Sequence, residues 1–500
     1  MIFIFLLAKR KKAFYHKCML SGKYINERSL LMDKIITKLY EIIKESSDLI
    51  RTEELIQLYM YDLFAELVGD IFSHINQVIK EQKQSDGWKV KREDWKTVQF
   101  VFGPVRYRRT LMVDQENQNH YPLDEWLGIR DYQRHSPLVE VKVAELASKC
   151  TYRDIAELLK EWTAITISHQ TVGSLLKRVG AAQSREDEES IVELEEATEL
   201  PEGKKVDYFY AEADGVFVHG TKKKKSLEVR HALLYEGWEK NGKRVSLKEP
   251  KVIMTTKKTA GFWAEIQAFT ASHYALQQAQ VITNSDGGQG YTADKFQEAF
   301  SQSNYPVLNQ LDSYHIFQGL NRAFGARTNI FKRKVKQALK THRLDELTIW
   351  LDTYESTLDE TQTVEKLNTL RTYVTRNWDR IFDWREKVDQ VPKEARGLGA
   401  MESNQRHISF RMKKRGMHWS EAGCEAMVKV KQGMLNHTLR EAYLHQQNRS
   451  TRQQRKRKQL VRLSSILHEK TRQSVGAKEG TIPLYAAHSS AIGQLVKSFR

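Results

Sequence analysis

The chain has 500 residues, 40% of them hydrophobic, so it is too long for one ordinary core and too apolar for a largely disordered protein. Lysine and arginine number 80 against 63 acids, and the net charge of +17 favours a polyanionic partner, with nucleic acid ahead of an acidic membrane surface. The three cysteines lie far apart and form no C-x-x-C pair, which argues against a disulfide framework or a thiolate zinc site and fits a reducing cytoplasm.

The first 31 residues differ in pattern from the rest of the chain. "MIFIFLLAKRKK" places a short apolar run before its basic residues, the reverse of a signal peptide, and the run is far shorter than the roughly 20 residues that cross a bilayer. Clean helical periodicity begins with "MDKIITKLYEII" at Met32. We therefore expect no targeting or membrane segment, and we interpret residues 1–31 as a translated leader before a natural start at Met32.

Residues 32–135 predict a mostly helical region with one β-hairpin. Apolar residues recur at three- and four-residue spacing to about residue 83, which indicates one or two amphipathic helices. Residues 96–114 then alternate around a Gly-Pro turn, as in a hairpin. Three arginines face outward in that pattern and contact either phosphates or solvent: Arg106, Arg108 and Arg109.

Residues 136–183 have helix-turn-helix spacing. One helical pattern runs from Thr151 to about Trp162, and a second begins near Ser168, whose hydroxyl would cap it. The first turn of the second helix carries the side chains that would read base edges: His169, Gln170 and Thr171. A plain helical hairpin is the alternative, and the basic balance of the chain favours DNA binding.

The second half of the chain predicts an α/β mixed sheet. An acidic stretch, residues 184–203, is interpreted as a linker. Over residues 204–324, three strands in hairpins precede alternating helices and strands. Residues 325–396 read as an all-helical insertion, and 397–445 as the last part of the core. Residues 446–500 form a basic tail with electrostatic affinity for phosphates.

Asp214 and Asp286 stand in strand patterns where an acid is out of character. Two carboxylates about 4 Å apart repel by roughly 4 kcal/mol at an effective dielectric of 20, so they need a proton or a cation between them. Oxygen ligands without cysteine suit Mg²⁺ or Mn²⁺. The neighbouring glycines, Gly215, Gly287 and Gly288, are expected to leave room for a phosphate backbone.

A third acid, Glu402, lies in "GLGAMESNQRHISFRMKKRGMHWS". Glu421 and Glu425 are nearby competitors for the same role. Five cations follow Glu402 and are predicted to contact DNA phosphates: Arg406, Arg411, Lys413, Lys414 and Arg415.

From residue 32 to about 440 the chain resembles the DDE transposases of bacterial insertion sequences, of the Mutator-like branch, which have a ribonuclease H-like core broken by a helical insertion. The resemblance implies that Asp214, Asp286 and Glu402 are the catalytic, metal-binding acids. The D-x-x-H signature of that family is present as Asp312 and His315 in "LDSYHI". These two residues would support the active site, although His315 also fits a core histidine.

The resemblance implies a transposase that binds the ends of its own insertion sequence and carries out metal-dependent strand cleavage and strand transfer. It would use two Mg²⁺ or Mn²⁺ ions, and its partners would be insertion-sequence ends, target DNA and further copies of itself. We expect a bacterial cytoplasmic, nucleoid-associated protein with no membrane or small-molecule substrate. Two alternatives are a helix-turn-helix regulator with an inactive core and a structure-selective nuclease of the same fold.

Overall fold

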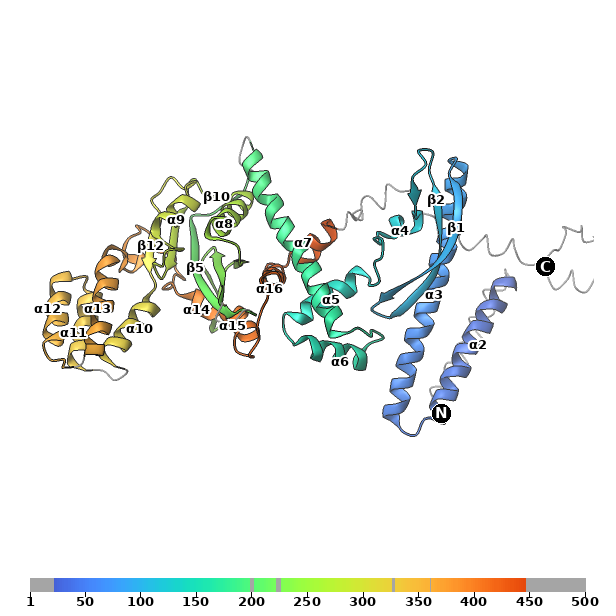
Figure 1. Ribbon diagram of the computed structural model, residues 1–500, viewed down its shortest axis with the longest axis horizontal. Coiled ribbons are helices and arrows are strands. Elements are labelled where there is room, and N and C mark those ends of the chain that lie inside the picture. Colours follow the sequence, from blue (N-terminus) through green and yellow to red (C-terminus); the bar gives the residue numbers. More distant parts are fainter. Residues whose placement is uncertain (1–21, 198–201, 222–225, 326–328, 360, 447–500) are drawn as a thin grey trace, which may run out of the picture. The chain divides into compact units, whose positions relative to one another are not determined.

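The computed structural model describes residues 22–197, 202–221, 226–325, 329–359 and 361–446 (Figure 1). The described chain forms two compact units, which divide between Arg134 and His135. The predicted basic tail lies outside the described residues, as do residues 1–21 of the predicted leader, whereas residues 22–31 belong to a helix. No helix in the described ranges combines the length and apolarity that a membrane crossing requires.

The first unit consists of a helical hairpin and a β-hairpin. Its helices are α2 (Gly22–Glu45) and α3 (Leu49–Ser85), and its long strands are β1 (Lys89–Phe100) and β2 (Gly103–Val113). Asp48 caps α3 by accepting a hydrogen bond from the Arg51 amide at 2.9 Å. Gly69 lets α3 approach β2, because a Cβ there would lie 2.4 Å from the Arg106 carbonyl oxygen.

Arg109 turns inward, against the prediction that it faces outward. Beyond the short strand β3 (Asn119–His120), helix α4 (Pro122–Leu127) carries Asp124, which is 2% exposed. Asp124 accepts hydrogen bonds from Lys96 Nζ and Tyr107 Oη, both at 2.9 Å, and pairs with Arg109. A buried carboxylate requires such compensation, so Arg109 is committed to the core of this unit.

The second unit contains the five-stranded sheet, whose strands are β5 (Tyr208–His219), β6 (Ser226–Tyr235), β9 (Lys251–Thr255), β11 (Gln280–Ser285) and β12 (Leu308–Leu311). Their spatial order is β12-β11-β5-β6-β9. Strand β6 is antiparallel to both neighbours, whereas β11 is parallel to both of its own. Two-stranded pairs form from β4 (Lys204–Lys205) with β10 (Tyr274–Ala275), and from β7 (Trp238–Asn241) with β8 (Arg244–Leu247). This mixed sheet agrees with the sequence prediction.

Helices cover both faces of the sheet. Alternate residues of β5, such as Phe209 and Ala211, pack with α8 (Thr259–His273) and α9 (Ala293–Ala299). Those between them, such as Tyr210 and Val216, share a core with helices from both ends of the unit. These helices are α5 (Pro137–Ala147), α6 (Tyr152–Trp162), α7 (His169–Glu196), α14 (Ala400–Asn404), α15 (Arg406–Met412), α16 (Glu421–Leu435) and α17 (Leu439–His445).

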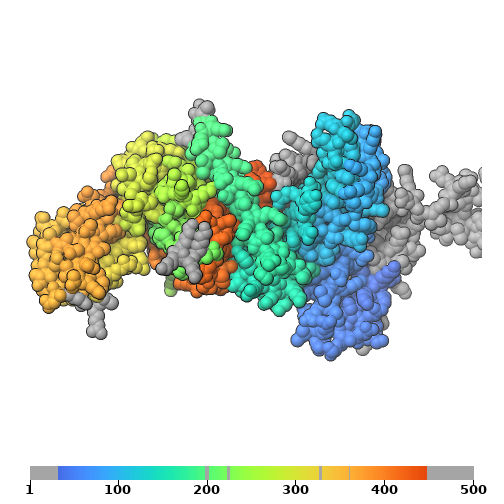
Figure 2. Space-filling view, in the orientation of Figure 1, coloured from blue at the N-terminus to red at the C-terminus, as the bar shows by residue number. Residues whose placement is uncertain are grey.

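The predicted helical insertion begins as expected and ends early. After α10 (Ser313–Phe324) come α11 (Ile330–Lys340), α12 (Leu344–Glu355) and α13 (Thr361–Arg376), which pack around a core of their own. Figure 2 shows these helices as a yellow and orange lobe. From residue 377 to 399 the regular helices are replaced by two short 3₁₀ turns, η1 (Trp378–Arg380) and η2 (Trp384–Glu386). At the buried Trp384 the chain is again beside the sheet, and the Trp384 ring stacks on that of Trp238 and meets that of Tyr210 edge-on.

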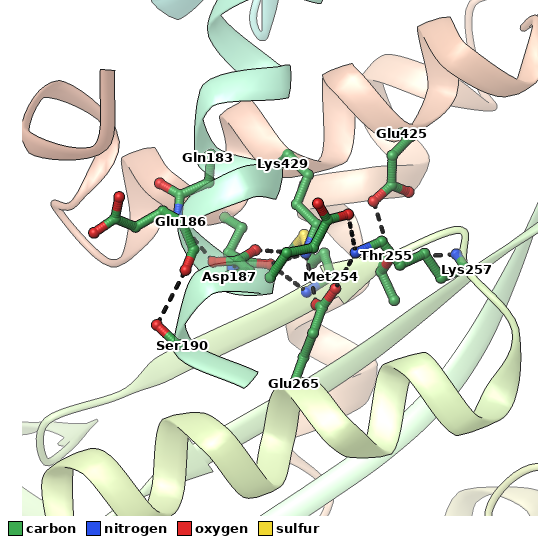
Figure 3. Close-up of polar contacts among 12 residues, drawn as sticks. Gln183, Glu186, Asp187, Ser190, Met254, Thr255, Lys257, Glu265, Glu425 and Lys429 are labelled. Carbon is green, nitrogen blue, oxygen red and sulfur yellow. Dashed lines mark hydrogen bonds and ion pairs between the residues drawn. The ribbon is translucent and has the colours of Figure 1, made fainter. Parts of the chain in front are cut away.

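The predicted acidic linker is wrong for residues 184–196, which continue α7. Its acids meet cations of the core, most of all Lys429 on α16, whose side chain is fully buried. Lys429 Nζ lies 2.6 Å from Asp187 of α7 and 2.6 Å from Glu265 of α8 (Figure 3). Although burial opposes its charge, Asp187 and Glu265 hold the pKa of Lys429 above the usual value. The charge run is therefore a packed helix face, and α7 belongs to the same compact unit as the sheet.

Replacing Lys429 by methionine should destabilise the second unit by about 3–5 kcal/mol, because it removes the cation that Asp187 and Glu265 share and leaves Glu265 with Lys257 alone, at 3.2 Å. Adding Glu265→Gln to this variant should recover part of the loss. Urea unfolding of the two variants and of Lys366→Met, an exposed control on α13, measures the difference. A loss no larger than that of the control would show that the ion pairs contribute little.

Candidate active site

Asp214 lies on the central strand of the sheet, with its side chain half-buried. One carboxylate oxygen accepts a hydrogen bond from the Gly215 amide at 2.7 Å, and the other accepts one from Gln405 Nε2. Burial raises the pKa of Asp214 to about 6, and the negative charge of Asp286 adds to the rise. Ionising Asp214 at this position therefore costs more free energy than ionising an aspartate in water.

Asp286 follows β11 directly and reaches the same end of the sheet. The parallel register pairs Asn284 with Glu212, so two residues further along both strands Asp286 comes beside Asp214. The Asp286 side chain accepts a hydrogen bond from the Gly288 amide at 2.8 Å, which closes a tight turn. The sequence prediction that these two acids meet is consistent with this geometry.

The glycines beside the acids make room for protein side chains, which corrects the expectation that they leave space for a phosphate backbone. A Cβ at Gly287, which has φ +77°, would lie 2.5 Å from Arg380 Nη1. A Cβ at Gly215 would lie 2.7 Å from Glu228 Oε1, and one at Gly288 would lie 3.2 Å from the carboxylate of Asp286. The space beside the glycines is therefore already filled.

The end of the insertion holds the Asp286 turn. Tyr373 Oη on α13 donates to the Asp286 carbonyl oxygen at 2.8 Å. Arg380 in η1 donates from Nη2 to Ser285 Oγ at 2.8 Å and from Nε to Asn309 Oδ1 at 2.7 Å. These contacts tie β11, β12 and the insertion together, so the position of Asp286 depends on residues almost 100 positions away.

Asp312 and His315 stand at the end of the next parallel strand, β12. Asp312 caps α10 through the Tyr314 amide at 3.0 Å, and its own amide donates to the Ser285 carbonyl oxygen at 2.9 Å. His315 Nδ1 lies 3.0 Å from the Asp312 carboxylate. That hydrogen bond raises the pKa of His315, and the charges of Asp214 and Asp286 raise it further. The side chain of His315 is 29% exposed, so it is not a fully buried core histidine.

Glu402 is exposed on α14 and is less firmly placed than the two aspartates. It precedes Gln405 by three residues, so the two side chains lie on one side of this helical segment, and Gln405 contacts Asp214. Of the competitors, Glu421 is exposed, while Glu425 is committed to β9, because it accepts hydrogen bonds from Thr255 Oγ1 at 2.9 Å and Thr256 Oγ1 at 2.6 Å.

Glu212, two residues before Asp214, anchors the helix that carries Glu402. Its fully buried carboxylate accepts hydrogen bonds from the amides of Gly399, Ala400 and Met401 at 2.9–3.2 Å, and from Tyr235 Oη at 2.8 Å. Burial raises the pKa of Glu212, although these hydrogen bonds oppose the rise. Glu212 therefore joins the central strand to the start of α14.

The donor set suits a divalent cation, although its members are not drawn tightly together. Asp214 and Asp286 supply oxygen atoms, and a hard cation would favour the ionised form of Asp214, whose pKa is raised by burial and by the charge of Asp286. Within the described ranges, the one group of three candidate ligands whose atoms lie within 4.8 Å of one another is Glu186, Glu189 and His445, on α7 and α17. Asp214, Asp286 and Glu402 therefore do not form a closed set of ligands in this structure.

Two helices form where the sequence predicts the helix-turn-helix, which a plain helical hairpin would also give. Helices α6 and α7 contact each other, and Ser168 caps α7 by accepting a hydrogen bond from the Thr171 amide at 3.2 Å. His169 and Gln170 are exposed and Thr171 is partly exposed at the start of α7. Contact of these three side chains with base edges stays a prediction.

Four of the five predicted phosphate-binding cations are exposed: Arg406, Lys413, Lys414 and Arg415. The prediction is wrong for Arg411, which is 2% exposed. Its Nε donates to the Ala147 carbonyl oxygen at 3.1 Å, and its guanidinium lies 5.4 Å from the Trp419 ring centre. Arg411 joins α15 to α5, so it belongs to the core.

Four residues of this site are absent from the sequence prediction: Glu212, Tyr373, Arg380 and Gln405. Glu212 carries a usable signal, since it is a second acid in the apolar strand "YFYAEADGV" and lies on the same face as Asp214. The other three carry none, because polar and aromatic residues on helices and turns are common.

The chain belongs to the family described as "Uncharacterised protein family (UPF0236)", whose model matches residues 43–449. A Streptococcus gallolyticus relative, "UPF0236 protein in vanSb 3'region", is 28% identical over 464 residues, which are 93% of this chain and 99% of the relative. A relative from Caldanaerobacter subterraneus subsp. tengcongensis is 24% identical over 403 residues, covering 79% of this chain and 77% of its own length. The name of that UPF0236 protein joins 11 designations, from TTE0033 to TTE2212.

The raised pKa of Asp214 predicts a pH-dependent effect of Asp214→Asn on stability. A folded-state pKa of about 6 lies above the ordinary value of 3.8, so the native carboxyl holds its proton longer and the wild type loses stability as pH rises through this window. The amide cannot ionise. The stability of the variant relative to wild type should therefore improve by about 2 kcal/mol between about pH 4.5 and about pH 8. Urea unfolding at both pH values tests this, and an unchanged difference would contradict it.

Proposed function

We propose that this chain is a DDE transposase with a ribonuclease H-like core, which cleaves and joins DNA at the ends of its own insertion sequence. The observation that carries the proposal is the meeting of Asp214 and Asp286 at one end of two parallel strands, in a sheet of order β12-β11-β5-β6-β9 with β6 reversed. A relative whose name joins 11 designations is what a gene carried in many copies would produce, and this supports a mobile element.

The residues have distinct roles in this proposal. Asp214 and Asp286, with Glu402 as the third acid, would hold two Mg²⁺ or Mn²⁺ ions, which activate the attacking oxygen and stabilise the leaving oxygen of an in-line displacement. Gln405 orients the Asp214 carboxylate, and Tyr373 fixes the turn that carries Asp286. His315, held by Asp312, would face phosphate oxygens, and its raised pKa would favour a protonated ring there.

DNA would be held by the elements around this site. The start of α7 would read the insertion-sequence end through His169, Gln170 and Thr171. The exposed cations Arg406, Lys413, Lys414 and Arg415 would position the phosphate backbone beside α14. Lys429 on α16 forms ion pairs with Asp187 of α7 and Glu265 of α8, and α7 belongs to the same compact unit as the sheet. DNA recognition and DNA cleavage would therefore be carried out by one compact unit.

Cleavage of DNA that carries the flanks of this gene tests the proposal directly. We expect cuts at defined ends with Mg²⁺ or Mn²⁺, none with chelator, and a rate loss of about 10³-fold or more in Asp286→Asn and Asp214→Asn, because the neutral amides keep shape but lose charge. Asp294→Asn, an exposed acid eight residues beyond Asp286, is the matched control.

Glu402→Gln should behave like the aspartate variants if Glu402 completes the site, and near-normal cleavage would remove it. Binding of DNA without cleavage by the wild type under every metal condition would favour a helix-turn-helix regulator. Cleavage without any strand transfer would favour a structure-selective nuclease.

Gln170→Ala should weaken binding to the insertion-sequence end by about 1–3 kcal/mol, because it removes a base contact. Binding to unrelated DNA of the same length should change little, since phosphate contacts remain. Fluorescence anisotropy on both DNAs measures the two affinities. An equal loss on both would assign Gln170 to backbone positioning.

A further inference from the structure

The helical hairpin of the first unit exposes more large apolar surface than its own packing explains. Among the exposed large apolar side chains of α2 and α3, which also include Leu49, Ile50 and Leu58, eight fall in two regular series and are between 37% and 64% exposed: Met32, Ile36, Tyr40, Ile43, Met60, Phe64, Leu67 and Ile71. Along α3 they are spaced by four, three and four residues, and along α2 by four, four and three. This spacing is that of a helix seam that packs against another helix. We call these eight residues the hairpin face.

Except for Phe64, whose ring meets that of Phe102 edge to face at 5.4 Å, the hairpin face is separate from the surfaces by which α2 and α3 pack on the rest of the unit. On α2, a neighbouring stripe that includes Ile35, Leu39 and Ile42 is partly buried, and α2 contacts α3. On α3, Ala65 and Ile75 are among the residues that pack against the β-hairpin. A further partly buried stripe of α3, which we assign to the contact with α2, consists of Leu55, Ile56, Tyr59 and Leu63. Each helix therefore has a second apolar stripe beyond the one that its partner in the hairpin covers.

The two exposed stripes lie on one side of the hairpin. Successive residues are about 100° apart around a helix axis. On α2 and on α3 alike, the exposed stripe lies roughly 80–90° around the axis from the stripe that faces the other helix, and the rotation has the same sense on both helices. Because α2 and α3 run antiparallel (Figure 1), equal displacements in the same sense bring both stripes to the same side. The eight side chains thus form one continuous apolar face.

The charge around the hairpin face disfavours a polyanionic partner. Between residues 32 and 71 there are nine acids against four lysines and arginines, in a chain whose net charge is +17. Such a segment repels DNA phosphates and anionic lipid headgroups. About half of eight large apolar side chains amounts to on the order of 700 Å² per copy, close to the roughly 800 Å² that each partner of a standard protein interface buries.

We propose that the hairpin face is a dimer interface, occupied by the hairpin of a second copy of this chain. A two-fold axis would place two α2–α3 hairpins face to face as a four-helix bundle, in which the same residues on both copies form the seam. This inference does not rest on the proposed function, because it concerns the first unit alone.

Sedimentation velocity of the full chain over a range of micromolar concentrations tests the interface. The wild type should be a dimer, and Ile36→Gln with Ile43→Gln should raise the dimer dissociation constant at least about 30-fold, because the seam loses four apolar side chains per dimer. The matched control is Ile330→Gln with Ile349→Gln, two isoleucines of the insertion that are 56% and 59% exposed, against 49% and 58% for the test pair. The control should dimerise like the wild type.

Leu67→Gln with Ile71→Gln on α3 is an independent second variant and should weaken the dimer as the α2 variant does. Circular dichroism of both variants verifies that the helices persist. A wild type that stays monomeric at every concentration overturns the proposal, whether or not it binds anionic vesicles, and so does equal dimerisation of the test and control variants. Sedimentation does not depend on DNA cleavage, so failure of this proposal leaves the proposed function standing.

Discussion

Asp214 and Asp286 are brought together by backbone hydrogen bonds between two parallel strands, β5 and β11. Parallel pairing places the carboxyl ends of both strands at the same edge, and the register aligns the two acids. The neighbouring strand β12 delivers Asp312 and His315 to that edge in the same way. A slip of one residue in either pairing would turn an acid to the opposite face, so the site depends on the register of the central sheet.

Bringing these charged side chains together shifts the pKa values of Asp214 and His315. Burial and the charge of Asp286 raise the pKa of Asp214, while the surrounding carboxylates raise that of His315. Like charges held at close range favour a proton or a cation, and in the proposed function this preference would draw divalent metal ions to the site. The same electrostatic constraint acts at Lys429, where Asp187 and Glu265 are balanced by two cations, Lys429 and Lys257.

Buried polar contacts connect segments that lie far apart in the chain. Glu212 on the central strand receives the start of α14, Tyr373 and Arg380 fix the turn at Asp286, and Lys429 fastens α7 to the core. Breaking one partner of such a contact leaves an uncompensated polar group, so each contact specifies a position more strongly than apolar packing would. The insertion therefore supports the site as well as interrupting the core.

The sequence by itself determined the order and type of most elements, because alternation and helical periodicity record which face of each element is buried. It also determined Asp214 and Asp286 as candidates, since an acid in an apolar strand is conspicuous. The tertiary structure decided what local pattern cannot express. The acidic stretch at residues 184–196 looked solvated, and it is helical because its partner cations, such as Lys429, come from distant elements. In the sequence Arg411 resembles the neighbouring cations, which are exposed. It is buried because its guanidinium donates to the Ala147 carbonyl oxygen and packs on the Trp419 ring. Glycines beside the acids make room for Arg380 and Glu228, which only the folded chain brings there.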